Sequence, residues 1–303
     1  MLRPKLVSLI CPVCRPGDDV REFIADARSA FGDACYECIV VDDHSTDGSC
    51  HDLPKDVLVV RTENRAGPAA ARHLGATHAR GDVLIWSEPG RRFLKAGLER
   101  VADLARSQDA IFLPRIGHRK TSRIRYGGQF VVSNQGVRIR SVYFKPAAQP
   151  ALYGGVCAMK QGVYRRLAEW PQLPDIWRYC DEAMSLMTWF VGVPTVVSEE
   201  IAFHRAPTRK GIGRPQISLD PLAHALSSHI LHAAFFSKTY SIFWKPLLER
   251  GHGVSIGNEV ILSAECSRIS KHLQRHAVRS ERKFFRDVLG VPFPDEADWT
   301  PSS

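Results

Sequence analysis

The chain has 303 residues and a formal net charge of +9, with 44% apolar and 24% charged residues. This composition excludes a disordered chain, and the length suffices to bury the core of one large α/β domain or two small ones. No segment approaches the apolar run needed to span a bilayer. The positive charge favours anionic partners such as phosphates, nucleic acid or a membrane surface, without choosing among them.

The first elements alternate between strands and helices. Residues 7–13, VSLICPV, have the composition of a buried strand. Asp18 or Asp19 can cap the helix that follows, whose apolar residues repeat at helical spacing, and Gly32 can end it. Residues 38–42 predict a second strand, which runs into the turn chemistry of DDHSTDG.

The same alternation continues through the next seventy residues. Pro68, in the run NRAGPAAARHLG, suits the first turn of a helix. A strand at 83–86, a helix at 94–106 and a strand at 110–113 follow. Strands separated by helices predict βαβ units, and therefore a Rossmann-like α/β fold with a mostly parallel sheet flanked by helices.

The character of the sequence changes after Pro114. Residues 115–145 carry many Arg and Lys and alternate around Asn134-Gln135-Gly136 in the manner of a hairpin. This stretch could bind nucleic acid, but it lacks regularly interleaved aromatic residues, so we predict a solvated or acceptor-facing loop and no nucleic-acid partner. From Asp220 onward the pattern is helical, with a break near Gly251–Gly253.

Two pairs of cysteines, Cys11-x-x-Cys14 and Cys35-x-x-Cys38, have the spacing of a four-cysteine zinc site. Geometry argues against zinc, because the first pair lies at the carboxyl end of one strand and the second at the entry to its parallel neighbour. At about 3.3 Å per residue the pairs stand more than roughly 10 Å apart, whereas zinc holds sulfur at about 2.3 Å. We predict no zinc. The apolar contexts of the cysteines and the absence of a signal-peptide pattern predict free thiols in the cytoplasm.

Three further histidines, His224, His229 and His232, lie on the C-terminal helical stretch. They lack the i, i+4 spacing of a metal pair. We therefore interpret them as ordinary surface histidines.

Polar residues follow two strands of the predicted sheet. Asp42 and Asp43 close the second strand, where an unpaired buried carboxylate is costly. Taken alone, they are equally well explained as a turn and a helix cap. Asn64, Gly67 and Arg72 follow at the next strand-to-helix crossing and so point to the same edge of the sheet. Ligands of open α/β sheets bind outside the carboxyl ends of the strands, so the pattern predicts a nucleotide site there.

This N-terminal pattern resembles the family 2 glycosyltransferases and their relatives, which have the GT-A fold. The resemblance implies a pocket for a nucleoside diphosphate sugar in which the acid pair holds base and ribose. The residues that it places at the nucleotide sugar are Pro12, Val13, Asp42, Asp43, Asn64, Gly67, Arg72, Glu88, Arg91 and Arg92.

The family's metal-binding Asp-x-Asp or Asp-x-His follows the strand that corresponds to 83–86, because a hard cation against the diphosphate needs oxygen ligands. Here Glu88 matches the first acid, but Gly90 stands where the second ligand should be. Two interpretations stay open. Arg91 and Arg92 supply fixed positive charge to the diphosphate, or they are surface residues and the site is weakened.

Residues 153–205 resemble the same family, and most closely the branch that includes the polypeptide N-acetylgalactosaminyltransferases. The run from Trp177 to Gly192, followed by His204, looks like that branch's acceptor-side motif. The resemblance implies that Asp181, or Glu182 after a one-residue shift, is the general base of an inverting enzyme. A helix cap is the alternative for both acids.

The resemblance also assigns the remaining roles on the acceptor side. It implies that a divalent cation, Mn or Mg, would be held by Glu88 and His204. It places Gly154, Gly155 and Trp177 near the acceptor.

We therefore expect a cytoplasmic transferase of the hexosyl class. It would move a sugar from a nucleoside diphosphate donor, a uridine one, to a hydroxyl of a small molecule or glycan. The expected domains are 1–215, with a nucleotide half at 1–114 and an acceptor half at 115–215, and a helical extension at 216–303. The alternative is a nucleotide-sugar-binding or scaffold protein of the same fold with weakened catalysis. We leave a homodimer open.

Overall fold

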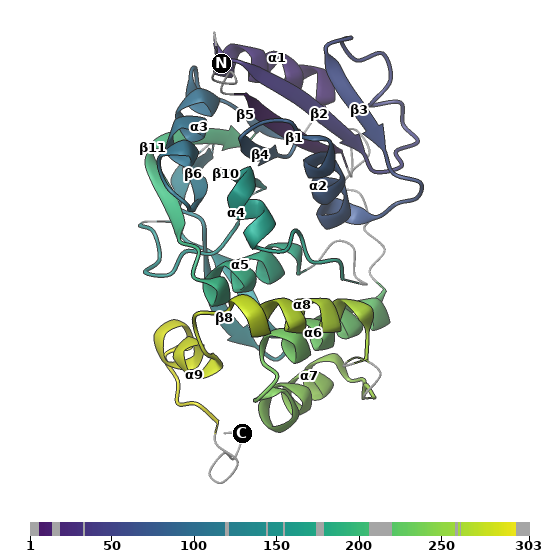
Figure 1. Cartoon of the computed structure of the whole chain (residues 1–303), viewed down its shortest axis with the longest axis vertical. Coiled ribbons are helices and arrows are strands. Elements are labelled where there is room, and N and C mark those ends of the chain that lie inside the picture. Colours follow the sequence, from purple (N-terminus) through teal and green to yellow (C-terminus); the bar gives the residue numbers. More distant parts are fainter. Residues whose placement is uncertain are drawn as a thin grey trace.

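The computed structural model describes residues 6–13, 19–32, 34–118, 121–143, 145–153, 155–173, 179–205, 220–257, 260 and 262–294, without the side chains of 118, 121–122 and 199–205. A central sheet with helices on both faces forms one end of the molecule, and the C-terminal helices form the other (Figure 1). Within these residues, no helix is both long enough and apolar enough to cross a bilayer.

Strands and helices alternate through the first half as predicted, except at Val57–Arg61 and Arg91–Arg92, two strands that were not predicted and that each follow a strand without an intervening helix. The strands are β1 (Val7–Val13), β2 (Tyr36–Asp42), β3 (Val57–Arg61), β4 (Val83–Ser87), β5 (Arg91–Arg92), β6 (Ile111–His118), β7 (Thr121–Arg125), β8 (Gly128–Ser133), β9 (Gly136–Ser141), β10 (Val156–Lys160) and β11 (Thr195–Arg205). The helices are α1 (Val20–Phe31), α2 (Gly67–His78), α3 (Gly97–Ser107), α4 (Gln161–Arg166), α5 (Cys180–Val191), α6 (Pro221–Phe235), α7 (Lys245–His252), α8 (Ala264–His276) and α9 (Glu281–Phe284). Two π-helical turns, η1 (Tyr240–Trp244) and η3 (Phe285–Leu289), continue the C-terminal part.

The main sheet has the strand order β3-β2-β1-β4-β10-β6-β11-β5, with β7 added to β6. The first four strands are parallel, which confirms the α/β class predicted from the sequence. β10 is antiparallel to both of its neighbours, β4 and β6. This order places β4 near the middle, with β1, β2 and β3 on one side and β10, β6, β11 and β5 on the other.

Side-chain alternation along β1 explains why helices cover both faces. Leu9 and Cys11 belong to the core cluster beneath α1 and α3, whereas Ile10 belongs to the cluster beneath α2. This is the period of two expected of a strand that is buried on both faces. The caps are as predicted, since Asp19 accepts a hydrogen bond from the Glu22 backbone N–H at 3.1 Å.

The basic stretch after Pro114 forms strands, and this corrects the expectation of a loop. β6 and β7 extend the main sheet, and β8 and β9 form the hairpin predicted around Asn134-Gln135-Gly136. Gly136 has a φ of +90°, the left-handed conformation that glycine adopts without strain. The sequence signal for the turn was local, whereas the pairing of β6 with β7 depends on contacts that the pattern does not contain.

The C-terminal helices share a hydrophobic core with the central sheet. The core cluster that contains Ile10 and Trp86 extends through α6 to Phe284 and Phe285. The division at residue 215 stays a prediction.

His224, His229 and His232 are buried, which corrects their interpretation as surface histidines. Nδ1 of His232 donates to the Ser228 carbonyl at 2.7 Å, and its Nε2 accepts from the Val137 N–H of the hairpin at 2.9 Å. His229 is 2.8 Å from the Tyr240 hydroxyl. Burial lowers the pKa of His232 to about 3 and that of His229 to about 4. α6 is buried over most of its length, so its histidines lie among core side chains.

The register of β1 and β2 bears on the two cysteine pairs. Leu9 lies opposite Cys38 and Val7 opposite Tyr36, so Cys35 is offset from Cys11 by roughly 16 Å at about 3.3 Å per residue. Cys14 lies outside the described residues. Cys38, opposite Leu9, is offset from Cys11 by only roughly 7 Å, so the separation used in the sequence argument holds for Cys35 and is wrong for Cys38.

Candidate active site

Asp43 fixes the start of α2 at the carboxyl edge of the sheet. Its side chain is buried and accepts hydrogen bonds from the backbone N–H groups of Ala66 at 2.7 Å and Gly67 at 2.9 Å. These are donors that a helix N-terminus leaves unpaired. The cap that the sequence left open as an explanation is therefore present, and removing the Asp43 carboxylate should cost stability as well as any ligand contact.

Asp42 is held by the turn that follows β2 and by the neighbouring strand β3. Its carboxylate accepts from the Ser45 N–H at 2.8 Å and pairs with Arg61 at the end of β3. Pro12 and Val13 lie beside it on β1, in register with Val41 and Asp42. Asn64 is exposed in the connection between β3 and α2. The predicted nucleotide residues thus gather along one sheet edge.

Arg72, in the middle of α2, connects two carboxylates from distant parts of the chain. Its Nη1 is 3.0 Å from Oδ1 of Asp181, and its Nη2 is 4.0 Å from Oε1 of Glu88. The guanidinium lies 4.6 Å from the ring centroid of Trp170 and is buried. Burial acts against the charge, but Asp181, Cys180 and Glu88 together raise the pKa of Arg72 above its ordinary value.

Glu88 follows β4 and contacts a second arginine. Nη2 of Arg91 is 3.3 Å from Oε2 of Glu88. The Glu88 backbone N–H donates to the Gly155 carbonyl at 3.1 Å. Gly155 has a φ of +72°, and a Cβ added there would lie 2.3 Å from Cδ of Glu88. Glycine is therefore needed at position 155, which the sequence analysis placed near the acceptor.

The two adjacent arginines have different surroundings. They form β5, so their side chains leave the strand in opposite directions. Arg91 is buried beside Glu88, whereas Arg92 pairs with Glu22 and lies 3.3 Å from Asp26, both on α1. The structure thus brings one of the two predicted arginines to Glu88.

Three predicted site residues cannot be placed in this way. Gly154 and Trp177 lie outside the described residues, and so does the side chain of His204. The backbone of His204 pairs with Arg92 across β11 and β5.

Asp181 and Glu182 both lie in the first turn of α5, but they face different partners. Asp181 is 26% exposed and contacts Arg72. Burial raises the pKa of the Asp181 carboxyl, Arg72 opposes this, and Glu88 adds to it. Oε1 of Glu182 is 3.3 Å from Nε of Arg138 on β9, and burial likewise raises the pKa of Glu182. Only Asp181 therefore belongs with Glu88, in what we call the donor-side cluster of Glu88, Arg91, Arg72 and Asp181.

The charge around Glu88 does not suit a resident divalent cation. Each of its carboxylate oxygens already faces a guanidinium, and a dication there would meet two positive charges. Gly90 supplies no ligand, and within the described residues no three His, Cys, Asp or Glu side chains are grouped to hold a metal. The described donor set fits an anion bound by arginine better than it fits a metal.

Sequence reasoning missed three residues that hold this arrangement. Arg61 pairs with Asp42, Trp170 stacks on Arg72, and Arg138 pairs with Glu182. Arg61 ends a β-branched run, VLVVR, which is a readable strand signal. Trp170 and Arg138 are far from their partners in the sequence, so no local pattern could have identified them.

Comparison with known proteins extends these observations. Residues 8–167 match the family described as glycosyl transferase family 2. Polypeptide N-acetylgalactosaminyltransferase 11 of Xenopus tropicalis is 25% identical over 182 residues, which cover 52% of this chain and 30% of that protein. Probable N-acetylgalactosaminyltransferase 6 of Caenorhabditis elegans is 26% identical over 186 residues, with the same coverage of 52% and 30%. The chain thus matches less than a third of the length of either relative.

Two solved structures share the fold. The crystal structure of GalNAc-T7 with UDP, GalNAc and Mn2+ superposes with a TM-score of 0.68 at 14% identity, covering 95% of this chain and 57% of that one. S. aureus TarS 1-349 in complex with UDP-GlcNAc gives a TM-score of 0.55 at 15% identity, covering 93% and 81%. The family match covers more than half of the chain and the architecture agrees with it: the chain belongs to glycosyl transferase family 2 and has the GT-A fold.

Proposed function

We propose that this chain transfers a sugar from a uridine diphosphate sugar to an acceptor hydroxyl by direct displacement, with Asp181 as the general base. One observation carries the proposal. Arg72 joins Asp181, at the start of α5, to Glu88, at the end of the central strand β4. The related structures whose descriptions name UDP or UDP-GlcNAc support the choice of a uridine donor.

The proposed reaction needs a base that is ionised and correctly oriented. Arg72 keeps the Asp181 carboxylate charged and fixed, while burial raises its pKa and so its affinity for a proton. Asp181 takes the proton of the acceptor hydroxyl as that oxygen bonds to the anomeric carbon. The bond from this carbon to the diphosphate breaks, and its electron pair leaves with the diphosphate.

The leaving diphosphate gains negative charge that the site must balance. We assign this task to Arg91, whose guanidinium already lies beside Glu88, with Arg72 behind it. Arginine can bind a phosphate oxygen pair through two parallel hydrogen bonds. This assignment uses residues of the chain alone and routes no step through a metal.

A second candidate function rests on Gly90. If the missing ligand is not compensated, the chain binds nucleotide sugar without efficient transfer and acts as a binding or scaffold protein. The two candidates differ in turnover and agree in UDP binding.

The test measures UDP release from a panel of uridine and guanosine diphosphate sugars, with and without hydroxyl acceptors, in EDTA and in Mn2+. Melting temperatures with each free nucleotide report binding separately, because a ligand of the native state raises them. We expect UDP to stabilise the protein and an acceptor to accelerate UDP release in EDTA. Stabilisation without release would favour the scaffold alternative. No stabilisation by any nucleotide would overturn both candidates.

A further inference from the structure

The middle of the chain contains an excess of positive charge. Between Asp109 and Glu169 there is no acidic residue, although Arg and Lys recur throughout. Several of these arginines contact tyrosine rings. We use the name arginine–tyrosine surface for Arg123, Arg125, Tyr143 and Tyr153.

The contacts within this surface are specific. The guanidinium of Arg125 lies 4.8 Å from the ring centroid of Tyr153 and 5.9 Å from that of Tyr143. Arg115 and Tyr126, 5.9 Å apart, form a separate pair, because Ile116 is in register with Arg125 and alternation turns Arg115 to the other face of the sheet. Hydrogen bonding from Arg125 and Ser141 lowers the pKa of Tyr143, and the charges of Arg125 and Arg123 add to the effect. The rings thus fix the direction of the guanidinium groups without neutralising them.

Part of this surface is open to solvent. Tyr143 is 38% exposed, Arg123 is exposed, and Arg125 and Tyr153 are half-buried. Aromatic faces beside charged guanidinium groups offer apolar area for a sugar ring together with donors for its anionic substituents. A neutral ligand would use only the first of these features.

Strand order places the surface next to the donor-side cluster. Gly155 contacts Glu88, and Tyr153 lies two residues before it. β7, which carries Arg123 and Arg125, pairs with the carboxyl end of β6 on the side that β10 also occupies, because β11 covers the other side of β6. The predicted nucleotide residues lie beyond β4 on the opposite side. A sugar held at Glu88 would therefore have the nucleotide on one side and this surface on the other.

We propose that the arginine–tyrosine surface binds the acceptor, and that the acceptor is an anionic glycan carrying carboxylate or phosphate groups. This inference rests on the proposed transferase function, because it identifies the acceptor of that same site. It also gives the basic stretch a role other than nucleic-acid binding. The shared chemistry is a sugar chain that carries negatively charged groups.

The test measures binding of the full chain, saturated with UDP, to four hexameric probes by isothermal titration calorimetry. The probes are a uronic acid hexamer, a sugar-phosphate hexamer, a neutral glucose hexamer and a single-stranded DNA hexamer. We expect one of the two anionic glycans to bind at least tenfold more tightly than the neutral hexamer and the DNA. Binding should weaken as salt is raised, because exposed charges are screened.

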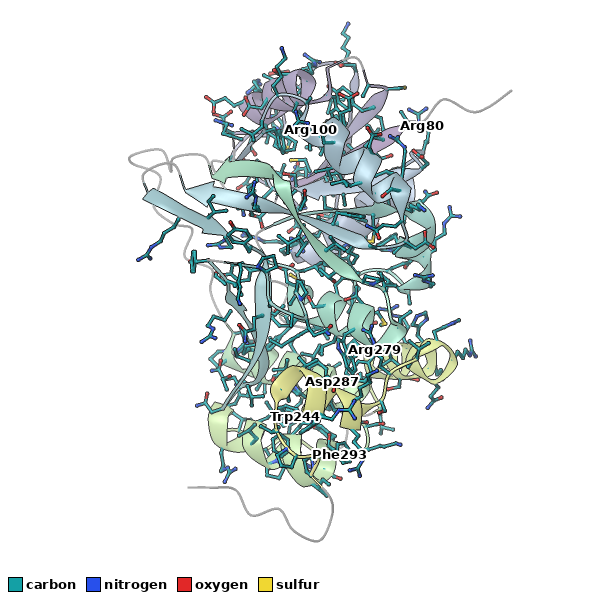
Figure 2. The ribbon with its side chains drawn as sticks, turned by 90° about the vertical axis from the view of Figure 1, so that its left-hand side faces the viewer. Arg80, Arg100, Trp244, Arg279, Asp287 and Phe293 are labelled. Atoms are coloured by element: carbon teal, nitrogen blue, oxygen red, sulfur yellow. The ribbon has the colours of Figure 1, made fainter. Side chains whose placement is uncertain are left out.

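A double variant, Arg123→Gln with Arg125→Gln, should weaken anionic glycan binding by at least tenfold. Arg100→Gln is the matched control, since Arg100 is exposed on α3 at the end of the molecule formed by the first helices and strands (Figure 2). The single variant Arg123→Gln changes only an exposed side chain, and should weaken binding even if the double variant folds poorly.

Three results would overturn the inference: equal binding of the neutral hexamer, tighter binding of DNA, or full binding by Arg123→Gln and the double variant. The UDP-induced rise in melting temperature separates this failure from that of the proposed function. A parent protein that responds to UDP but binds no anionic glycan refutes the acceptor assignment alone. A parent that does not respond to UDP refutes the function on which it rests.

Discussion

The first turn of α5 carries two acids, a half-buried Asp181 and a buried Glu182, whose surroundings differ in one respect. Asp181 joins the donor-side cluster, whereas Glu182 joins what we call the hairpin-side cluster of Glu182, Arg138, Tyr179 and His224. Each acid has one arginine partner, and burial raises the pKa of each. What differs is the second neighbour. Arg72 also faces the carboxylate of Glu88 at the end of β4, whereas Arg138 lies 4.6 Å from the ring centroid of Tyr179.

This comparison shows why a raised pKa is not enough to identify a base. Both acids have the electrostatic signature of a functional carboxylate. Tyr179 stacks on His224 at 5.1 Å, so the hairpin-side cluster continues into packed side chains. The donor-side cluster continues to Glu88 and Arg91 at the sheet edge, where an α/β fold binds its ligand.

The largest expected effect comes from replacing each of the two acids separately by its amide. Asp181→Asn should lower turnover by roughly 10²–10⁴-fold, the range typical of a lost general base. Glu182→Gln should keep turnover near that of the parent and cost about 1–2 kcal/mol of stability, through its weakened contact with Arg138. Steady-state rates and urea unfolding of both variants check this. Equal losses of turnover would remove the distinction between the clusters.

A second effect should be confined to the donor-side cluster. Gly155→Ala places a methyl group against the Glu88 carboxyl and forces a positive φ on alanine. We expect a cost of about 2–4 kcal/mol in unfolding free energy, with weaker UDP-sugar binding. Gly162→Ala on α4 is the control, because its added Cβ meets nothing within 4 Å and helical alanine is favoured over glycine. If both variants unfold like the parent, the close approach of Gly155 to Glu88 is wrong.

Two buried histidines of α6, His229 and His232, should make the free energy of unfolding depend on pH. The folded pKa of His232 is about 3 and that of His229 about 4, below the unfolded value of about 6.5. The unfolded state therefore binds more protons between these values, so stability is full above pH 6.5 and falls as the pH falls. From pH 7 to 5 we expect a loss of about 2 kcal/mol for each histidine.

Urea unfolding at the two pH values measures this loss. His232→Gln should reduce the difference, whereas His78→Gln, on an exposed position of α2, should leave it unchanged. A parent protein with the same stability at pH 5 and pH 7 would show that these histidines become protonated without unfolding.

The smallest expected effect tests the charge balance of the donor-side cluster. Gly90→Asp adds a carboxylate two residues after Glu88, and its Cβ meets no atom within 4 Å. We expect Mn2+ to stabilise this variant by about 1–2 kcal/mol and the parent by less, because a second acidic ligand suits a hard cation. Melting curves in Mn2+ and in EDTA provide the measurement. Stronger stabilisation of the parent by Mn2+ would mean that other residues complete a metal site.

The sequence predicted those structural features whose signals lie close together in the chain. Caps and turns such as Asp19 and Gly136 were predictable, because their signals lie within a few residues. The gathering of Asp42, Asp43 and Arg72 at one edge followed from the rules of parallel sheets. The choice between Asp181 and Glu182 did not, because it depends on Arg72 and Arg138, which reach α5 from other elements.

Burial of the histidines was misjudged for a related reason. A histidine on a helix looks like a surface residue unless the opposite face is known to pack as well. α6 lies between the hairpin and the other C-terminal helices, and His232 bonds to Val137 across 95 positions of sequence. Figure 2 shows Trp244 and Phe293 at this end of the molecule, far from Arg80 and Arg100.

A crystal structure of the UDP complex tests the central claim most directly. Our account predicts the diphosphate within hydrogen-bond distance of the Arg91 guanidinium, beside Glu88, with the uridine along the edge formed by β1, β2 and α2. Asp181 should face the space next to the diphosphate, and Glu182 should still contact Arg138. A diphosphate bound at the arginine–tyrosine surface, or one that approaches Glu182 instead of Asp181, would contradict the account.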